Sequence, residues 1–217
     1  MARMLILAVL PAVLLASGLA MAQAPAPSQG RNITGTVGND TISGGGRANP
    51  IAGRAGNDTI DGGGGNDRAT GGPGTDLIDG GNGDDVLAGG PERDSLSGGN
   101  GSDALVDIQG SNIFSGGPVS DSLNGGSDED VLRAGDGNDG LTGASGDDHL
   151  FGDAGEDRID GGLGKDTIDG GAGSDNIVAF DAQVDTILCG AGSDIVRADA
   201  GDSISRDCER VFVTSSR

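Results

Sequence analysis

The chain has 217 residues, and its 45 Gly are roughly three times the usual share of about 7%. Asp and Glu total 34 against 13 Lys and Arg, which gives a formal net charge of −21, and aromatic residues make up 2% of the chain. This composition excludes a thick core of large side chains, and the charge argues against nucleic acid as a partner because phosphate binding needs a basic surface.

Residues 1–24 differ from the rest of the chain. Arg3 precedes an apolar run over residues 5–16, and small residues then allow cleavage after Ala22 or Ala24. This is the pattern of a secretory signal peptide, and the run is shorter than the ~20 residues that an uncleaved membrane anchor would need. We expect Sec-type export, a secreted extracellular protein that is free or cell-surface associated, no membrane span after cleavage, and a short leader over residues 25–30.

The chain from Asp40 to Asp175 repeats every nine residues without an insertion. The sixteen repeat positions carry fourteen Asp and two Asn, and an apolar residue follows two places after each of them. Such a register is not expected of a disordered polyanion, which is the other reading of an acidic chain with few aromatic residues. The fourteen acidic positions are Asp40, Asp58, Asp67, Asp76, Asp85, Asp94, Asp103, Asp121, Asp130, Asp139, Asp148, Asp157, Asp166 and Asp175.

The nine-residue unit predicts a turn followed by a short strand. Its Gly-rich part disfavours a helix and suits tight turns, and its last three residues place one apolar side chain between two mostly polar ones. Two units make an eighteen-residue coil, and stacked coils give an all-β, parallel β-roll (a β-solenoid) with two facing parallel sheets. Eight or nine coils spaced by about 4.8 Å would form a rod of about 40 Å.

The most regular units read GGPGTDLID (71–79), GGNGDDVLA (80–88) and GGLGKDTID (161–169). They resemble the GGxGxDxUx nonapeptide of RTX, or haemolysin-type calcium-binding, proteins, in which U is a large apolar residue. The resemblance covers residues 31–180, and residues 181–217 continue it as a degenerate C-terminal cap. It implies that each Ca²⁺ is held by Asp carboxylates and backbone carbonyls of two stacked turns.

Electrostatics independently favours a cation in these turns. Asp residues eighteen apart stack on one another and repel, and a thin core cannot offset that repulsion over many coils. Ca²⁺ accepts 6–8 oxygen ligands, including carbonyls, whereas Zn²⁺ or copper would need the His or Cys that the repeats lack. Eleven stacked Asp pairs suggest on the order of ten Ca²⁺ ions, with weak or empty sites next to Asn112 and weakened first coils around Asn49.

The cap contains the two cysteines of the chain, Cys189 and Cys208, nineteen residues apart. If the coil persists, they lie about 5 Å apart, within reach of a disulfide, which a secreted chain favours. A locked last coil would cover the end of the core, and we expect a monomer.

The leading functional hypothesis is a secreted calcium-binding rod that folds on meeting extracellular Ca²⁺, with a structural or surface-interaction role. Its partners would be calcium ions and cell-surface polysaccharide or other surface proteins. One alternative is an adhesive or ice-binding module, although the residues flanking each strand do not repeat regularly. Another is a carboxylate-based hydrolase, but we expect no enzyme, because the chain has one His, His149, and no aromatic platform for a sugar.

Overall fold

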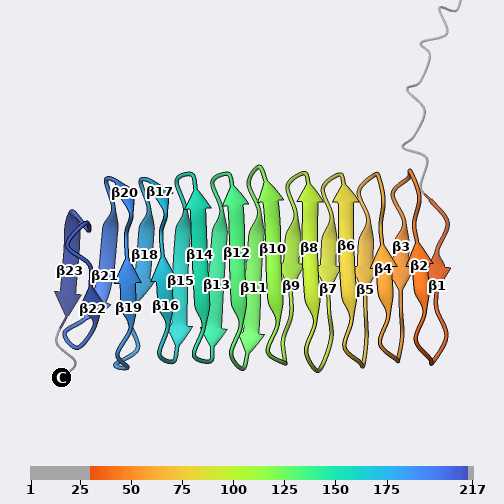
Figure 1. Cartoon of the computed structure of the whole chain (residues 1–217), viewed down its shortest axis with the longest axis horizontal. Helices are drawn as coiled ribbons and strands as arrows, with labels where there is room; N and C mark the ends of the chain where they lie inside the picture. Colours follow the sequence, from red (N-terminus) through yellow and green to blue (C-terminus); the bar gives the residue numbers. More distant parts are fainter. Residues whose placement is uncertain (1–29, 215–217) are drawn as a thin grey trace, which may run out of the picture.

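The computed structural model describes residues 30–214, and these form a straight stack of flat coils with a strand on each side (Figure 1). The predicted signal peptide and all but the last residue of the predicted leader lie outside the described residues. Between residues 30 and 214, no helix is long and apolar enough to cross a membrane.

The strands divide between two sheets, and every strand pairing within residues 30–214 is parallel. The first sheet has eleven strands, in the order β1 (Ile33–Thr34), β3 (Pro50–Ala52), β5 (Arg68–Thr70), β7 (Val86–Ala88), β9 (Ala104–Val106), β11 (Ser122–Ser127), β13 (Gly140–Ser145), β15 (Arg158–Leu163), β18 (Asn176–Ala179), β21 (Ile195–Asp199) and β23 (Arg210–Thr214). Odd- and even-numbered strands thus alternate between the sheets over most of the chain, because each nonapeptide crosses from one sheet to the other.

The second sheet has twelve strands. Its main path is β2 (Thr41–Ser43), β4 (Thr59–Asp61), β6 (Leu77–Asn82), β8 (Ser95–Asn100), β10 (Ile113–Pro118), β12 (Val131–Asp136), β14 (His149–Ala154), β16 (Thr167–Asp169), β19 (Thr186–Leu188) and β22 (Ser203–Ile204). Two short strands, β17 (Ala172–Gly173) and β20 (Ala191–Gly192), pair beside this path.

The predicted parallel β-roll is therefore confirmed, with a regular register of eighteen residues. Ile78 lies beside Ile60 and Leu96, and Leu141 lies beside Leu123, as the repeat requires. The stack has about ten coils rather than eight or nine, because residues beyond 180 continue the same pairing up to β23.

The core is one aliphatic side chain deep on each sheet. All sixteen apolar repeat positions are buried, from Ile42 at 7% exposed to Leu87 at 0%, and even the small Ala69 points inward. The cap extends this core with Ile187 and Val196.

Several strands are longer than the three residues that the unit predicts. In β6, for example, the strand continues through Gly80 and Gly81 to Asn82, and Gly81 stays in register with Gly99. Gly81 has a positive φ of 95°, so the chain turns there without leaving the ladder, which a larger residue would do only under strain. The Gly pair is thus both the end of the strand and the start of the turn.

Candidate calcium sites in the turns

The repeat acids form two continuous columns, one along each edge of the rod. We call the column whose residues directly precede strands of the second sheet the first ladder. The column whose residues directly precede strands of the first sheet is the second ladder. The first ladder is Asp40, Asp58, Asp76, Asp94, Asn112, Asp130, Asp148, Asp166, Asp185 and Asp202. The second ladder is Asn49, Asp67, Asp85, Asp103, Asp121, Asp139, Asp157, Asp175, Asp194 and Glu209.

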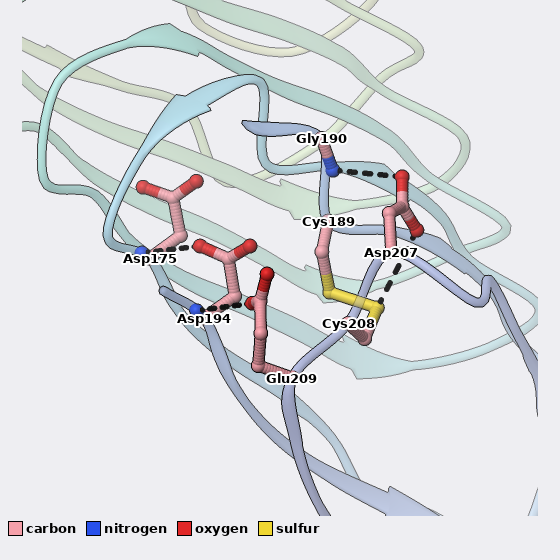
Figure 2. Close-up of a disulfide and its surroundings, with 7 residues drawn as sticks. All are labelled: Asp175, Cys189, Gly190, Asp194, Asp207, Cys208 and Glu209. Atoms are coloured by element: carbon pink, nitrogen blue, oxygen red, sulfur yellow. Dashed lines mark hydrogen bonds between the residues drawn. A yellow bond between two sulfur atoms is a disulfide. The ribbon is translucent and has the colours of Figure 1, made fainter. Parts of the chain in front are cut away.

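Each rung of a ladder is a hydrogen bond between neighbouring coils. The backbone N–H of one acid donates to a side-chain oxygen of the next acid along the rod, over 2.6–3.0 Å. Asp175 donates in this way to Asp194, and Asp194 donates to Glu209 (Figure 2). In every Asp that accepts such a bond the accepting atom is Oδ1, so one carboxylate oxygen of each of these residues joins two coils.

The other carboxylate oxygen of most ladder residues has no hydrogen-bond partner. These residues are 0–5% exposed, and an oxygen buried without a partner is costly unless a proton or a cation satisfies it. The fifteen orphan atoms are Oδ2 of Asp58, Asp67, Asp76, Asp85, Asp94, Asp103, Asp121, Asp130, Asp139, Asp148, Asp157, Asp166, Asp175, Asp185 and Asp194.

At many turns the orphan oxygen faces a backbone carbonyl across a small space that only Gly leaves open. A Cβ placed on Gly62 would lie 2.7 Å from Asp67 Oδ2 and 2.6 Å from the carbonyl oxygen of Gly80, in the next coil. A Cβ on Gly170 would meet Asp175 Oδ2 and the carbonyl oxygen of Cys189 in the same manner, at 2.7 and 2.8 Å. Two electron-rich oxygens that converge without a donor between them suit a hard cation.

The two Asn in the ladders indicate what the Asp residues lack. Asn112 Nδ2 donates to the carbonyl oxygens of Gly110, at 2.9 Å, and Gln109, at 3.3 Å. Asn49 Nδ2 likewise donates to turn carbonyls, including that of Gly44 at 3.0 Å. The amide group of Asn thus places partly positive hydrogens where an Asp has its second, negative oxygen. In a turn with Asp, a cation at this place would interact favourably with the same carbonyls.

Burial is the main cause of the raised pKa values of the ladder carboxyls without metal. Neighbouring carboxylates raise the pKa further in most of them, and the hydrogen bond from the preceding coil opposes the shift. The pKa rises to about 7 for Asp94, Asp121, Asp130 and Asp157, and to about 6 for Asp85, Asp148, Asp166, Asp175 and Asp185. Near neutral pH, ionised carboxylates in the ladders therefore destabilise the metal-free turns.

The donor set fits Ca²⁺ and argues against softer metals. No three His, Cys, Asp or Glu side chains gather closely enough to hold a metal on their own anywhere in residues 30–214. A site would thus need one or two carboxylates completed by turn carbonyls, an all-oxygen set of the kind that Ca²⁺ takes. The residues that would hold the ions are the orphan-bearing Asp residues and the backbone carbonyls that face them.

Thirteen of the fourteen acids predicted as ligands carry an orphan oxygen, and Asp40 is the exception. Asp40 is half-buried, and its Oδ2 accepts hydrogen bonds from the Thr36 backbone N–H, at 2.6 Å, and from Thr36 Oγ1, at 3.0 Å. Asp185 and Asp194 carry orphan oxygens but were not predicted, because the spacing in the ladders widens to nineteen residues there. The acid-x-apolar pattern that continues past Asp175 was the available signal.

The predicted disulfide between Cys189 and Cys208 is confirmed (Figure 2). Their Cα atoms are 5.2 Å apart, and Cys189 is fully buried at the end of the core. The bridge ties the segment that carries Glu209 to the coil before it, so it anchors the end of the second ladder.

Comparison with known families agrees with this geometry. The family model described as RTX calcium-binding nonapeptide repeat (4 copies) matches residues 34–69, 43–78, 70–105, 109–141, 142–177 and 182–204, well over half of the chain. The chain belongs to this RTX repeat family. It is a calcium-binding structural repeat protein whose repeats form a β-roll. A search of curated proteins finds no match.

Proposed function

We propose that this RTX-repeat protein is secreted and that its rod forms when the exported chain meets extracellular Ca²⁺. The observation that carries the proposal is the set of fifteen buried Oδ2 atoms without a partner. Most of these carboxylates have pKa values raised by burial, so folding without metal is opposed by the same groups that would bind the ions. Calcium binding energy would then appear as folding energy.

Export is supported by two features of the chain. Residues 1–24 have the charge, apolar run and small residues of a signal peptide. The Cys189–Cys208 disulfide suits an oxidising compartment outside the cytosol. In such a compartment Ca²⁺ would be available to fill on the order of ten turn sites, starting from the orphan-bearing Asp residues.

A structural or surface-interaction role fits the outer faces better than ice binding does. Outward positions that lie side by side differ in chemistry: Ser115 pairs with Arg133, and Arg133 pairs with Phe151. A flat ice-binding face would need the same small polar residues on successive coils. We propose no reaction for the chain, and cell-surface polysaccharide or surface proteins remain the partners that we propose.

The proposal is tested by titrating the metal-free chain with Ca²⁺ and following far-UV circular dichroism, with Mg²⁺ as the control. We expect a cooperative transition from coil to β structure with Ca²⁺ and none with Mg²⁺, which keeps its waters and demands a stricter geometry. A β spectrum that persists unchanged in excess chelator would refute calcium-driven folding. Secretion is tested separately, by N-terminal sequencing of the exported protein, which we expect to begin within residues 23–25.

A further inference from the structure

The coil interrupted by Asn112 contains a carboxylate at a position where the regular repeats have none. Asp107 stands five residues before Asn112, at the place where regular units such as GGPGTDLID have their first Gly. Despite that unusual position it is only 3% exposed. Its backbone N–H pairs with the carbonyl oxygen of Asn124 at 3.0 Å, so the segment stays in the stack.

The side chain of Asp107 points at the orphan oxygen of Asp94. A Cβ added to Gly89 would collide with Asp94 Oδ2 and Asp107 Oδ2 alike, so both oxygens face one small space. At regular turns the second oxygen in this space is a backbone carbonyl, as at Gly116, where it belongs to Ala134. The interrupted turn has a charged oxygen in place of a neutral one.

The two carboxylates differ in how well the protein satisfies them. Asp107 accepts hydrogen bonds from Gly90 N–H, at 3.1 and 3.2 Å to its two oxygens, and from Ile108 N–H at 2.8 Å. Asp94 Oδ2 has no partner, and Asp94 is 2% exposed. The backbone thus holds Asp107 in place beside an unsatisfied, buried carboxylate.

We propose that Asp94 and Asp107 together bind one Ca²⁺, so that the coil interrupted by Asn112 keeps a metal on its Asp94 side. Two carboxylates match the charge of a divalent cation, and Ca²⁺ accepts carboxylate ligands from different segments of chain. This differs from the expectation that both sites flanking Asn112 are weak or empty. On the side of Asp130, the Asn112 amide already satisfies turn carbonyls, and there we assign no ion.

This inference rests on the proposed calcium-dependent folding, and the test separates the two. Hydrogen–deuterium exchange is followed by mass spectrometry during a Ca²⁺ titration of the purified chain, and bound Ca²⁺ is counted by calorimetry. Two variants remove one negative charge each: Asp107→Asn, and the control Asp79→Asn, which alters an exposed outward position of β6. Peptides covering residues 89–112 report the proposed site, and peptides covering 139–175 report regular turns.

We expect Asp107→Asn to lower the number of bound Ca²⁺ ions by one. The Ca²⁺ concentration that protects residues 89–112 should rise at least about tenfold, while residues 139–175 and the Asp79→Asn variant behave as the parent chain does. Unchanged stoichiometry and protection in Asp107→Asn would overturn the inference and leave a proton shared between the two acids. Absence of Ca²⁺-dependent protection at residues 139–175 in the parent chain would instead refute the proposed function.

A fold defect would not block the test. If Asp107→Asn does not fold, Asp107→Ser is measured in the same way, because its hydroxyl still offers an acceptor to Ile108 N–H. Loss of one ion with intact regular turns supports the site in either variant, and retention of that ion in either variant contradicts it.

Discussion

Each interior ladder Asp uses its two oxygens for different purposes. Oδ1 accepts a backbone hydrogen bond and joins two coils, whereas Oδ2 is left for a cation, as Asp148 illustrates. An Asn keeps the first function and replaces the second with an amide that donates to turn carbonyls. Asp and Asn are therefore interchangeable for stacking but opposite in their demand for positive charge.

This division predicts the effect of Asp148→Asn. We expect the variant to bind fewer Ca²⁺ ions, yet to be at least as resistant to urea as the parent chain when both are metal-free, because a buried charge is removed. The comparison variant Asp148→Ala loses the rung to Asp130 as well, and should be destabilised by about 1–3 kcal/mol. Urea unfolding with and without chelator measures both. Equal calcium binding by Asp148→Asn and the parent would contradict the assignment of Oδ2.

The first Gly of a unit is needed for space. A Cβ on Gly116 would lie 2.5 Å from Asp121 Oδ2 and 2.6 Å from the carbonyl oxygen of Ala134. Gly116→Ala should therefore weaken Ca²⁺ binding at this turn about tenfold or more, and destabilise the calcium-loaded coil. The matched control is Gly140→Ala, in β13, because the nearest atom to its added Cβ is 4.0 Å away. Calorimetric Ca²⁺ titration of both variants checks this, and an equal loss of binding in both would show that steric blockage of the turn is not the cause.

At the scale of the element, a strand contributes one or two inward side chains, and stability comes from stacking. Leu141 is 1% exposed and lies in register between Leu123 and Ile159. Because each coil contacts only its neighbours, the effect of a core deletion should stay local.

Leu141→Ala is expected to cost about 2–5 kcal/mol in unfolding free energy of the calcium-loaded rod, through lost burial and the cavity left behind. Thr142→Ala, on the outward face of the same strand, should cost much less. Exchange protection would fall mainly in β11, β13 and β15. A uniform loss of protection from β1 to β23 would show that the rod unfolds as one unit rather than coil by coil.

The sequence predicted the sheets, their register and the core, because one unbroken nine-residue period determines all three. It did not predict Asp185 and Asp194 as ligand candidates, because the turns after Asp175 absorb one extra residue while the strands keep their pairing. It also did not identify Asp107 as a ligand candidate, because Asp107 departs from the nine-residue unit. Only the stacked coils show that its side chain points toward Asp94. The split between Oδ1 and Oδ2 was equally invisible, since it depends on which backbone N–H lies behind each carboxylate.

At the scale of the whole molecule, the rod ends differ from its interior. At the two ends of the first ladder the Oδ2 atom is hydrogen-bonded, to Thr36 in Asp40 and to Asp199 N–H in Asp202. Asn49 begins the second ladder, and Glu209 ends it. The orphan oxygens are thus confined to the interior coils, so a proton or a cation is needed there and not at the ends.

Because of these buried carboxyls, the stability of the metal-free rod should fall as the pH rises. Burial raises the pKa of ladder carboxyls, to about 7 at Asp94, Asp121 and Asp157, from an ordinary value of 3.8. Between these values the folded state binds more protons than the unfolded state, so its stability is lost as the pH rises through the folded pKa and regained as the pH falls. Protons and Ca²⁺ compete for the same oxygens.

We therefore expect the chelated chain to gain β structure as the pH is lowered from about 8 to about 5, because the folded state takes up protons once the pH falls below about 7. The Ca²⁺ concentration needed to load the sites should rise over the same interval, because binding must displace protons. Far-UV circular dichroism with excess chelator measures the first effect, and Ca²⁺ titration at each pH measures the second. Replacing several interior ladder Asp residues by Asn should flatten both profiles. If the chelated chain were equally unfolded at both ends of the range, the orphan oxygens would not be what opposes folding without metal.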